Sequence, residues 1–289
     1  MKSILTRITF SLLSLFIYKG FSQNQITDIY SINFSDELTF PKWSPNGSKI
    51  LCTDHHNSKL YIIDLKSEEV TMIKEKEGIG YMANWSADGD KIIYRDKPLN
   101  GYFSDSKAKS LSLTDGAVRN EININPQNTK VMNQKNKNLQ IYINPETLQL
   151  EAKNTDTNVV RKISNEVGQY YHCLVSPSGN KVVVHEGSSI YLYHIYDKKK
   201  REYLGEGIAT SWLKDDKGII TFEDKSSDGH NITASELYMI SLKDKKKVQL
   251  TRTKDRIEMN ADVSPDGKKI VFSDEKTGKL FVGNLKYRL

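Results

Sequence analysis

The chain has 289 residues, of which 37% are hydrophobic and 27% charged, and its mean hydropathy is −0.56. This length allows a sizeable buried core, whereas the polar average excludes an integral membrane domain and fits many short amphipathic strands. The formal net charge of +6 falls to +3 (39 basic against 36 acidic residues) without Lys2, Arg7 and Lys19. Nucleic acid is therefore not an expected partner.

The first 22 residues differ in composition from the rest of the chain. Lys2 and Arg7 precede the apolar run 8–18, and Gly20-Phe21-Ser22 offers small residues at positions that a signal peptidase recognises. The run is too short to span a bilayer. We therefore predict a signal peptide over residues 1–22 and export to the periplasm or beyond, with an uncleaved anchor as the alternative. No transmembrane segment is expected after cleavage.

One short pattern occurs six times in the remaining chain. An apolar anchor residue ends one strand, a turn of the type Ser-Pro-Asp-Gly reverses the backbone, and Lys-Ile or Lys-Val opens the next strand. The fullest copy, VSPDGKKI, spans residues 263–270. The spacing is typical of four-stranded propeller blades, with steps of 42, 39, 51, 37 and 51 residues. The six anchors are Trp43, Trp85, Ile124, Val175, Trp212 and Val263.

The residue types in these turns have a physical reason. Proline fixes φ at the first central position of the turn, and glycine adopts the positive φ that the turn requires. Two copies depart from the pattern. Asn128 replaces the turn glycine in the copy that begins at Ile124, and Asp216 replaces it in the copy that begins at Trp212. Both residue types tolerate the left-handed conformation, so we expect turns there as well.

The repeat resembles that of TolB-type propellers, also called WD-like repeats, over about residues 25–289. The resemblance implies an all-β fold, a six-bladed β-propeller of four-stranded antiparallel blades. In TolB an α/β domain precedes the propeller, and few residues precede the first blade here. We therefore expect the propeller alone, as one domain over residues 23–289. The family includes binding platforms, gating domains of peptidases and some lyases, so the motif indicates architecture rather than function.

The expected strands of the first two blades can be assigned in chain order. In blade one, apolar and polar residues partly alternate, as half-buried strands require. Blade two has two clear strands, joined by a longer connection at 98–107. The expected strands are 39–43, 49–53, 60–65 and 70–74 in blade one, and 91–94 and 110–113 in blade two.

The third blade has the weakest pattern. Residues 148–153 and 159–163 are interpreted as its outer strands, but 139–143 also has a strand pattern, which leaves open an extra hairpin. The next two blades are clearer, and blade five contains an insertion at 225–235. Their expected strands are 181–185 and 190–195 in blade four, and 218–222 and 237–242 in blade five.

The sixth blade ends before a fourth strand is complete. Residues 269–273 and 279–284 are its second and third strands, and little chain remains after them. Residues 26–34 have a strand pattern but belong to no other blade. We therefore predict that this N-terminal strand supplies the missing outer strand and closes the ring, which would pair an otherwise open sheet edge.

Five copies carry an acidic residue eleven positions after the anchor, and only the third copy departs, with Lys135. One interpretation is that each carboxylate accepts backbone N–H groups in the turn between the second and third strands. The alternative is an acidic ring at the mouth of the central channel that attracts a basic peptide or a cation. The five acids are Asp54, Asp96, Glu186, Glu223 and Asp274.

Aromatic, amide and acidic residues at the start of the inner strands belong to the same face. Such groups suit recognition of a peptide or sugar, although packing within the loops also explains them. These residues are Tyr81, Asn84, Tyr170, Tyr171, His172, Glu258 and Asn260.

Catalytic and metal-binding motifs are missing from the sequence. There is no Gly-x-Ser-x-Gly elbow and no His-Glu-x-x-His, so no catalytic residue, metal ligand or cofactor is assigned. Lyases on related propellers use several histidines around a metal, and His55, His172 and His185 are the candidates for such a site. Cys52 and Cys173 fall on opposite sides of the expected ring and are predicted to be buried free thiols.

The sequence as a whole favours an exported, non-enzymatic and monomeric binding platform. Its expected partner is an envelope protein or an extended peptide that docks at the channel mouth, as the resemblance to TolB implies. The alternative is a carbohydrate-active, lyase-like enzyme with a histidine-bound metal at the same face.

Overall fold

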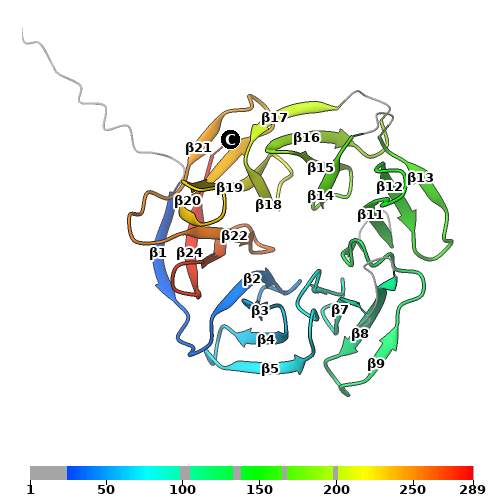
Figure 1. Ribbon diagram of the computed structural model, residues 1–289, viewed down its shortest axis with the longest axis horizontal. Helices are drawn as coiled ribbons and strands as arrows, with labels where there is room; N and C mark the ends of the chain where they lie inside the picture. Colours follow the sequence, from blue (N-terminus) through cyan, green and yellow to red (C-terminus); the bar gives the residue numbers. More distant parts are fainter. Residues whose placement is uncertain (1–24, 98–104, 133–137, 165–167, 198–200, 289) are drawn as a thin grey trace, which may run out of the picture.

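The computed structural model describes residues 25–97, 105–132, 138–164, 168–197 and 201–288. Within these residues the secondary structure consists of β-strands and turns, and the strands form six four-stranded antiparallel sheets. Figure 1 shows the sheets arranged as blades around a central axis. The predicted six-bladed β-propeller is therefore confirmed. The predicted signal peptide lies outside the described residues.

Each blade takes its strands from consecutive segments of the chain, except the last. From the axis outward, blade one consists of β2 (Leu38–Trp43), β3 (Lys49–Asp54), β4 (Lys59–Asp64) and β5 (Val70–Glu75), and blade two of β6 (Asn84–Trp85), β7 (Lys91–Asp96), β8 (Lys107–Ser112) and β9 (Val118–Asn120). Blade three consists of β10 (Val131–Met132), β11 (Leu139–Ile143), β12 (Leu150–Asn154) and β13 (Val160–Lys162), and blade four of β14 (Tyr170–Val175), β15 (Lys181–Glu186), β16 (Ser189–His194) and β17 (Glu202–Glu206). Blade five consists of β18 (Ile208–Trp212), β19 (Gly218–Ser226), β20 (Ile232–Ser241) and β21 (Lys247–Gln249), and blade six of β22 (Glu258–Val263), β23 (Lys269–Asp274), β24 (Lys279–Lys286) and β1 (Gln25–Ser31).

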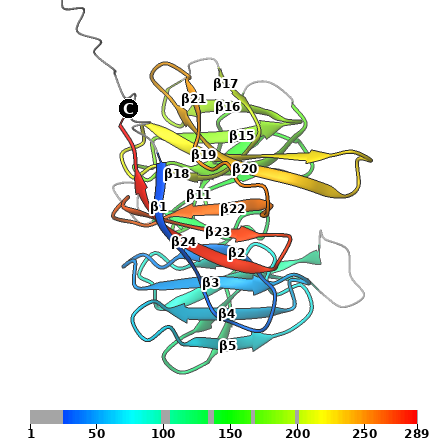
Figure 2. The same cartoon turned by 90° about the vertical axis from the view of Figure 1, so that its left-hand side faces the viewer.

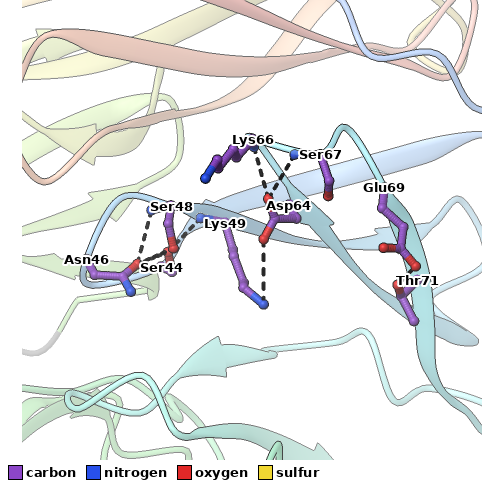
Figure 3. A network of polar contacts seen from close by, with 9 residues as sticks. All are labelled: Ser44, Asn46, Ser48, Lys49, Asp64, Lys66, Ser67, Glu69 and Thr71. Atoms are coloured by element: carbon purple, nitrogen blue, oxygen red, sulfur yellow. Dashed lines mark hydrogen bonds and ion pairs between the residues drawn. The ribbon is translucent and has the colours of Figure 1, made fainter.

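The repeated turns have the predicted geometry. In blade one, Gly47 has a φ of 72°, and the Ser44 hydroxyl accepts a hydrogen bond from the Lys49 backbone N–H at 2.9 Å. Figure 3 shows this turn beside the turn at Asp64, whose carboxylate accepts the Lys66 N–H at 2.9 Å. The same hydrogen bond, from a lysine backbone N–H to a serine hydroxyl, recurs in blades two, four and six. Asp216 has a φ of 56°, as expected for the residue that replaces the glycine.

The tryptophan anchors join neighbouring blades. The indole N–H of Trp43 donates to the Asp262 carbonyl, that of Trp85 to the Lys42 carbonyl, and that of Trp212 to the Leu174 carbonyl, at 2.9–3.0 Å. Each acceptor stands one position before the anchor of the preceding blade. The anchors are therefore buried apolar groups and also hydrogen-bond donors that fix the rotation between blades.

The buried core is divided among the blade interfaces. Each cluster of buried apolar side chains takes residues from two adjacent blades, for example Ile50 of blade one against Val271 of blade six. Cys52 and Cys173 are buried free thiols, as predicted. Apolar side chains thus hold each sheet against its neighbours, and the backbone bonds hold each sheet together.

The third copy of the repeat was assigned to the wrong residues. The Ile124 segment precedes the blade, and the inner strand is β10, in which Met132 pairs with Leu139 as Trp43 pairs with Ile50. Met132 is therefore the anchor position. The strand at 139–143 is the second strand of the blade, β11, and the sheet contains no extra hairpin among the described residues. Lys135 lies outside the described residues, and the position eleven residues after Met132 is Ile143.

The fourth strand of blade six comes from the N-terminal part of the described chain. β1 runs antiparallel to β24, with Gln25 opposite Lys286 and Ser31 opposite Phe281. Both views show the two strands side by side (Figures 1 and 2). Ile26 packs on the core between blades five and six.

The insertion in blade five extends the hairpin β19–β20 beyond its neighbours, with pairing as far as Ser226 opposite Ile232. Figure 2 shows this hairpin projecting beyond one face of the ring. No described helix is long and apolar enough to cross a membrane.

Candidate functional site

The inner strands enclose a cavity of about 990 Å³. It is lined mainly by the inner strands and the segments that lead into them, in blades one to six, and also by residues of neighbouring strands and turns, such as Leu51, Arg95 and Pro177. We call this cavity the channel. Each inner strand follows the outermost strand of the preceding blade, so all six begin at the same face of the ring. Residues near their first positions therefore meet at one end of the channel.

Backbone irregularities place side chains in the channel. Four inner strands contain a β-bulge, between Thr39 and Lys42 in β2, Tyr170 and Cys173 in β14, Ala209 and Ser211 in β18, and Met259 and Asp262 in β22. A bulge redirects the side chains of its extra residues, and such features are frequent next to binding sites. The bulged residues that line the channel are Phe40, Tyr171, His172 and Thr210. Lys42, which directly follows the bulge of β2, also lines the channel.

Three large aromatic side chains remain exposed at the end where the inner strands begin. Phe40, Tyr81 and Tyr171 line the channel with exposed fractions of 47%, 45% and 54%. We call these three residues the channel mouth. The guanidinium carbon of Arg95 lies 4.0 Å from the ring centre of Tyr81. The Tyr171 hydroxyl donates to the Gly187 carbonyl at 2.9 Å, which fixes its ring. Aromatic groups held in this way offer apolar contact at a low entropic cost.

Charged groups line the channel inside the mouth. Lys42 and Lys130 reach it from blade one and from the segment before β10, and Asp262 reaches it from blade six. The Asp262 carboxylate accepts hydrogen bonds from the backbone N–H of Trp43 at 2.8 Å and from the Ser211 hydroxyl at 2.9 Å, so it joins three blades. Burial lowers the pKa of Lys130, which Asp262 partly opposes and Lys42 reinforces.

Two histidines lie side by side in blade four. The ring centres of His172 and His185 are 5.2 Å apart. His185 Nε2 accepts the Ala209 N–H at 2.8 Å, so the proton is on Nδ1, which lies 3.4 Å from the His172 carbonyl oxygen. Burial lowers the pKa of His172 to about 3 and that of His185 to about 4, so both rings are neutral at pH 7. His185 therefore connects blades four and five.

The third candidate metal ligand, His55, is directed elsewhere. Its Nδ1 lies 3.6 Å from a carboxylate oxygen of Glu275, at the boundary between blades one and six. Within the described ranges, no group of three or more His, Cys, Asp or Glu side chains is arranged to hold a metal ion.

Two of the five predicted acids fix turns. Asp54 accepts the N–H groups of Ser58 at 2.6 Å and of Lys59 at 2.8 Å. Burial alone would raise the pKa of Asp54, but these bonds lower it below its ordinary value. Asp274 is fully buried and accepts the Ile257 N–H at 2.8 Å and the Thr277 hydroxyl at 2.6 Å. For these two residues the structure agrees with the turn interpretation.

The other three acids form ion pairs within the chain. Asp96 pairs with Lys76 and, at 2.6 Å, with Lys109, and Glu186 pairs with Arg201 at 2.8 Å. Burial raises the pKa of Asp96, but the hydrogen bonds from Lys109 and Lys76 lower it overall. Glu223 pairs with Lys247. Because all five carboxylates have partners inside the chain, they attract a basic partner less than an unpaired acidic ring would.

The remaining predicted residues fall into two groups. Tyr81, Asn84, Tyr171 and His172 line the channel, whereas Glu258 and Asn260 are not among its lining residues. Asn260 donates to the Thr39 hydroxyl at 3.2 Å and so connects blades six and one. Glu258 is completely buried, which leaves no exposed surface for a partner to contact.

The sequence contained a signal for the residues that the prediction missed. The position directly before the anchor is polar in four blades, although anchors and strands around it are apolar. These residues are Lys42, Ser211 and Asp262, which the prediction missed, and Asn84, which it included, and all four line the channel. Lys130 and Arg95 carry no such signal, because their positions relative to the channel depend on how the blades pack.

Solved structures share this fold. The β-propeller domain of Cps50 (Swd1) from Myceliophteria thermophila is 10% identical, with a TM-score of 0.58 over 88% of this chain and 98% of that one. A putative TolB from Agrobacterium tumefaciens is 16% identical, with a TM-score of 0.58 over 90% and 97%. An oligogalacturonate lyase in complex with manganese is 15% identical, with a TM-score of 0.52 over 88% and 78%.

These likenesses define the chain as a β-propeller similar to those of TolB-like and WD40-like proteins. The resemblance of the sequence repeat to TolB-type propellers is thus confirmed for the fold. At identities of 10–16% the comparisons show the fold alone. No protein family model and no curated protein matches the sequence.

Proposed function

We propose that this protein is an exported, non-enzymatic binding module whose channel mouth docks a protein or peptide of the cell envelope. The observation that carries the proposal is the channel mouth itself, three exposed aromatic side chains at one end of a cavity of about 990 Å³. Aromatic residues in concave, rigid surroundings supply most of the binding energy at many interfaces. Export rests on the signal-like residues 1–22.

The rigidity of the ring supports this proposal. Phe40 and Tyr171 lie in β-bulges of strands that are paired in their sheets, and Asn84 is held by the Thr129 hydroxyl at 3.0 Å. A partner therefore meets side chains whose positions are largely fixed before binding, which reduces the entropy lost on association. Tyr81, Asn84, Tyr171 and His172 are the proposed contact residues from the sequence, and Phe40 and Arg95 are added to them.

Selection of peptides from a random library on the immobilised protein tests the proposal. We expect selected peptides to bind the Phe40→Ala/Tyr171→Ala double variant at least tenfold more weakly, because truncating two aromatic contacts removes more than about 1.4 kcal/mol of binding free energy. The matched control is Tyr203→Ala, which removes a tyrosine of 48% exposure from the outer strand β17. Equal affinity for the double variant and the unchanged protein contradicts docking at the mouth.

A further inference from the structure

Two lysine side chains enter the channel from different blades. Lys42 follows the bulge of β2, and Lys130 stands directly before β10. Both line the cavity. Among the residues that the structure describes, neither ammonium group makes a hydrogen bond or an ion pair. Two donors with three N–H groups each thus line the channel without an acceptor among the described residues.

The neighbouring acid does not neutralise both lysines. Asp262 is held in place by the Trp43 N–H and the Ser211 hydroxyl, and it supplies one negative charge. Lys42 and Lys130 supply two positive charges, and the neutral His172 adds none. The net charge of Lys42, Lys130 and Asp262 together is therefore +1.

The excess of positive charge along the channel favours an anion. The apolar walls of the channel, which include Trp43, Trp85 and Trp212, strengthen the field of the two ammonium groups. The effect of Lys42 agrees with this excess, because its charge lowers the pKa of Lys130. An anion placed between the lysines would oppose this effect.

We propose that Lys42 and Lys130 bind a carboxylate group of the partner that docks at the channel mouth. This inference rests on the proposed function and names the chemistry of its ligand. A carboxylate carries the single negative charge that balances the two lysines and Asp262, whereas a dianionic phosphate would exceed it. The carboxylate belongs to a peptide chain, either at its C-terminus or on an Asp or Glu side chain.

Short peptides provide a direct probe. The protein with ¹³C-dimethylated lysines is titrated with Gly-Gly-Phe, with its C-terminal amide, and with N-acetyl-Gly-Glu-Phe amide, and the lysine signals are followed by NMR. Signals are assigned with Lys42→Gln and Lys130→Gln. We expect saturable shifts of both signals with a carboxylate peptide, a higher pKa of Lys130 in the bound state, and no saturation with Gly-Gly-Phe amide.

The arms of this experiment separate the two sources of the carboxylate. Saturation by Gly-Gly-Phe assigns the site to a peptide C-terminus, and saturation by the glutamate peptide assigns it to a side chain. Lys162 on the outer strand β13 is the control signal, and it should not saturate. Equal effects at Lys162, equal binding of the amide, or tighter binding of inorganic phosphate than of both peptides would overturn the inference.

A second measurement distinguishes failure of the carboxylate site from failure of docking. Peptides selected on the channel mouth should lose about tenfold or more in affinity with either Lys42→Gln or Lys130→Gln, because a charge-assisted hydrogen bond is lost. Unchanged melting temperatures verify that the variants fold. If Phe40→Ala/Tyr171→Ala abolishes binding and both lysine variants bind normally, docking stands and the carboxylate site is wrong. If neither set of substitutions matters, docking itself is wrong.

Discussion

The carboxyl group of Glu258 is the most unfavourably placed acid of the described chain by burial. It is completely buried at the start of β22, and neither oxygen accepts a hydrogen bond within the described residues. The Nε atom of Arg256 lies 3.7 Å from a carboxylate oxygen of Glu258, and this Nε also lacks a hydrogen-bond partner among the described residues. Burial raises the pKa of Glu258 to about 7 and Glu236 adds to the rise, whereas the neighbouring Thr251, Arg256 and Thr253 oppose it. The folded protein therefore holds a proton on Glu258 at pH values where the unfolded chain has released it.

This proton makes stability fall as pH rises. Between the unfolded pKa of about 4.5 and the folded pKa of about 7, the folded state binds more protons, so the free energy of unfolding decreases with pH across that window. Glu258→Gln keeps the size and removes the charge. We expect this variant to gain on the order of 1–3 kcal/mol relative to the unchanged protein between pH 5 and pH 8.

Urea unfolding at several pH values measures the difference between the two proteins. Taking the difference removes the contributions of His172 and His185, whose lowered pKa values act in the opposite direction and reduce stability below about pH 6.5. A difference that stays constant from pH 5 to pH 8 would show that Glu258 titrates normally. Arg256→Gln serves as the companion variant, since it should raise the pKa of Glu258 further.

Elements of the ring differ in how far they were predictable. The Ser-Pro-x-Gly turns and the strands after them were confirmed because a turn requires particular residues at fixed positions, as at Gly47 and Gly179. The inner strand of blade three was misplaced because β10 has only two residues, too few for alternation, while Asn125–Asn128 nearby has the composition of a turn. The channel charges were missed because Lys130 meets Lys42 only after the blades have packed.

The N-terminal strand β1 offers a sharp test at the scale of elements. A Cβ atom on Gly283 of β24 would lie 2.5 Å from Cγ2 of Ile26, so β1 occupies the space above this glycine. We expect Gly283→Ala to destabilise the full chain by about 1–3 kcal/mol, since overpacking forces β1 away. Removing residues 25–31 should lower the melting temperature sharply, because an edge of blade six loses its partner.

The losses of stability caused by Gly283→Ala and by removing residues 25–31 should not be additive. In the chain without residues 25–31, Gly283→Ala should cost little, because the atoms that it displaces are gone. Thermal unfolding of the four proteins in this cycle measures the coupling. Additive effects, or a deletion that leaves the melting temperature unchanged, would contradict the stabilising role of β1 in closing the ring.

At the scale of the whole molecule, the channel is lined both by groups that join the blades and by the groups proposed for docking. The five acids of the repeat are used within turns and ion pairs, and the tryptophan anchors join the blades. The channel keeps aromatic and basic groups that these contacts do not use. The sequence predicted the ring and two of the three residues of the mouth, because turns are local, whereas the charge of the channel arises only when distant segments meet.

Site-directed photocrosslinking of the full chain in its envelope extract is the most direct test of docking at the channel mouth. A photoreactive phenylalanine analogue replaces Phe40 or Tyr171, and Tyr203 or Val118 on outer strands as controls, which are exposed to a similar extent. We predict one and the same crosslinked partner from Phe40 and Tyr171, displaced by peptides selected on the mouth, and none from the controls. Crosslinks from the outer strands alone would contradict the account.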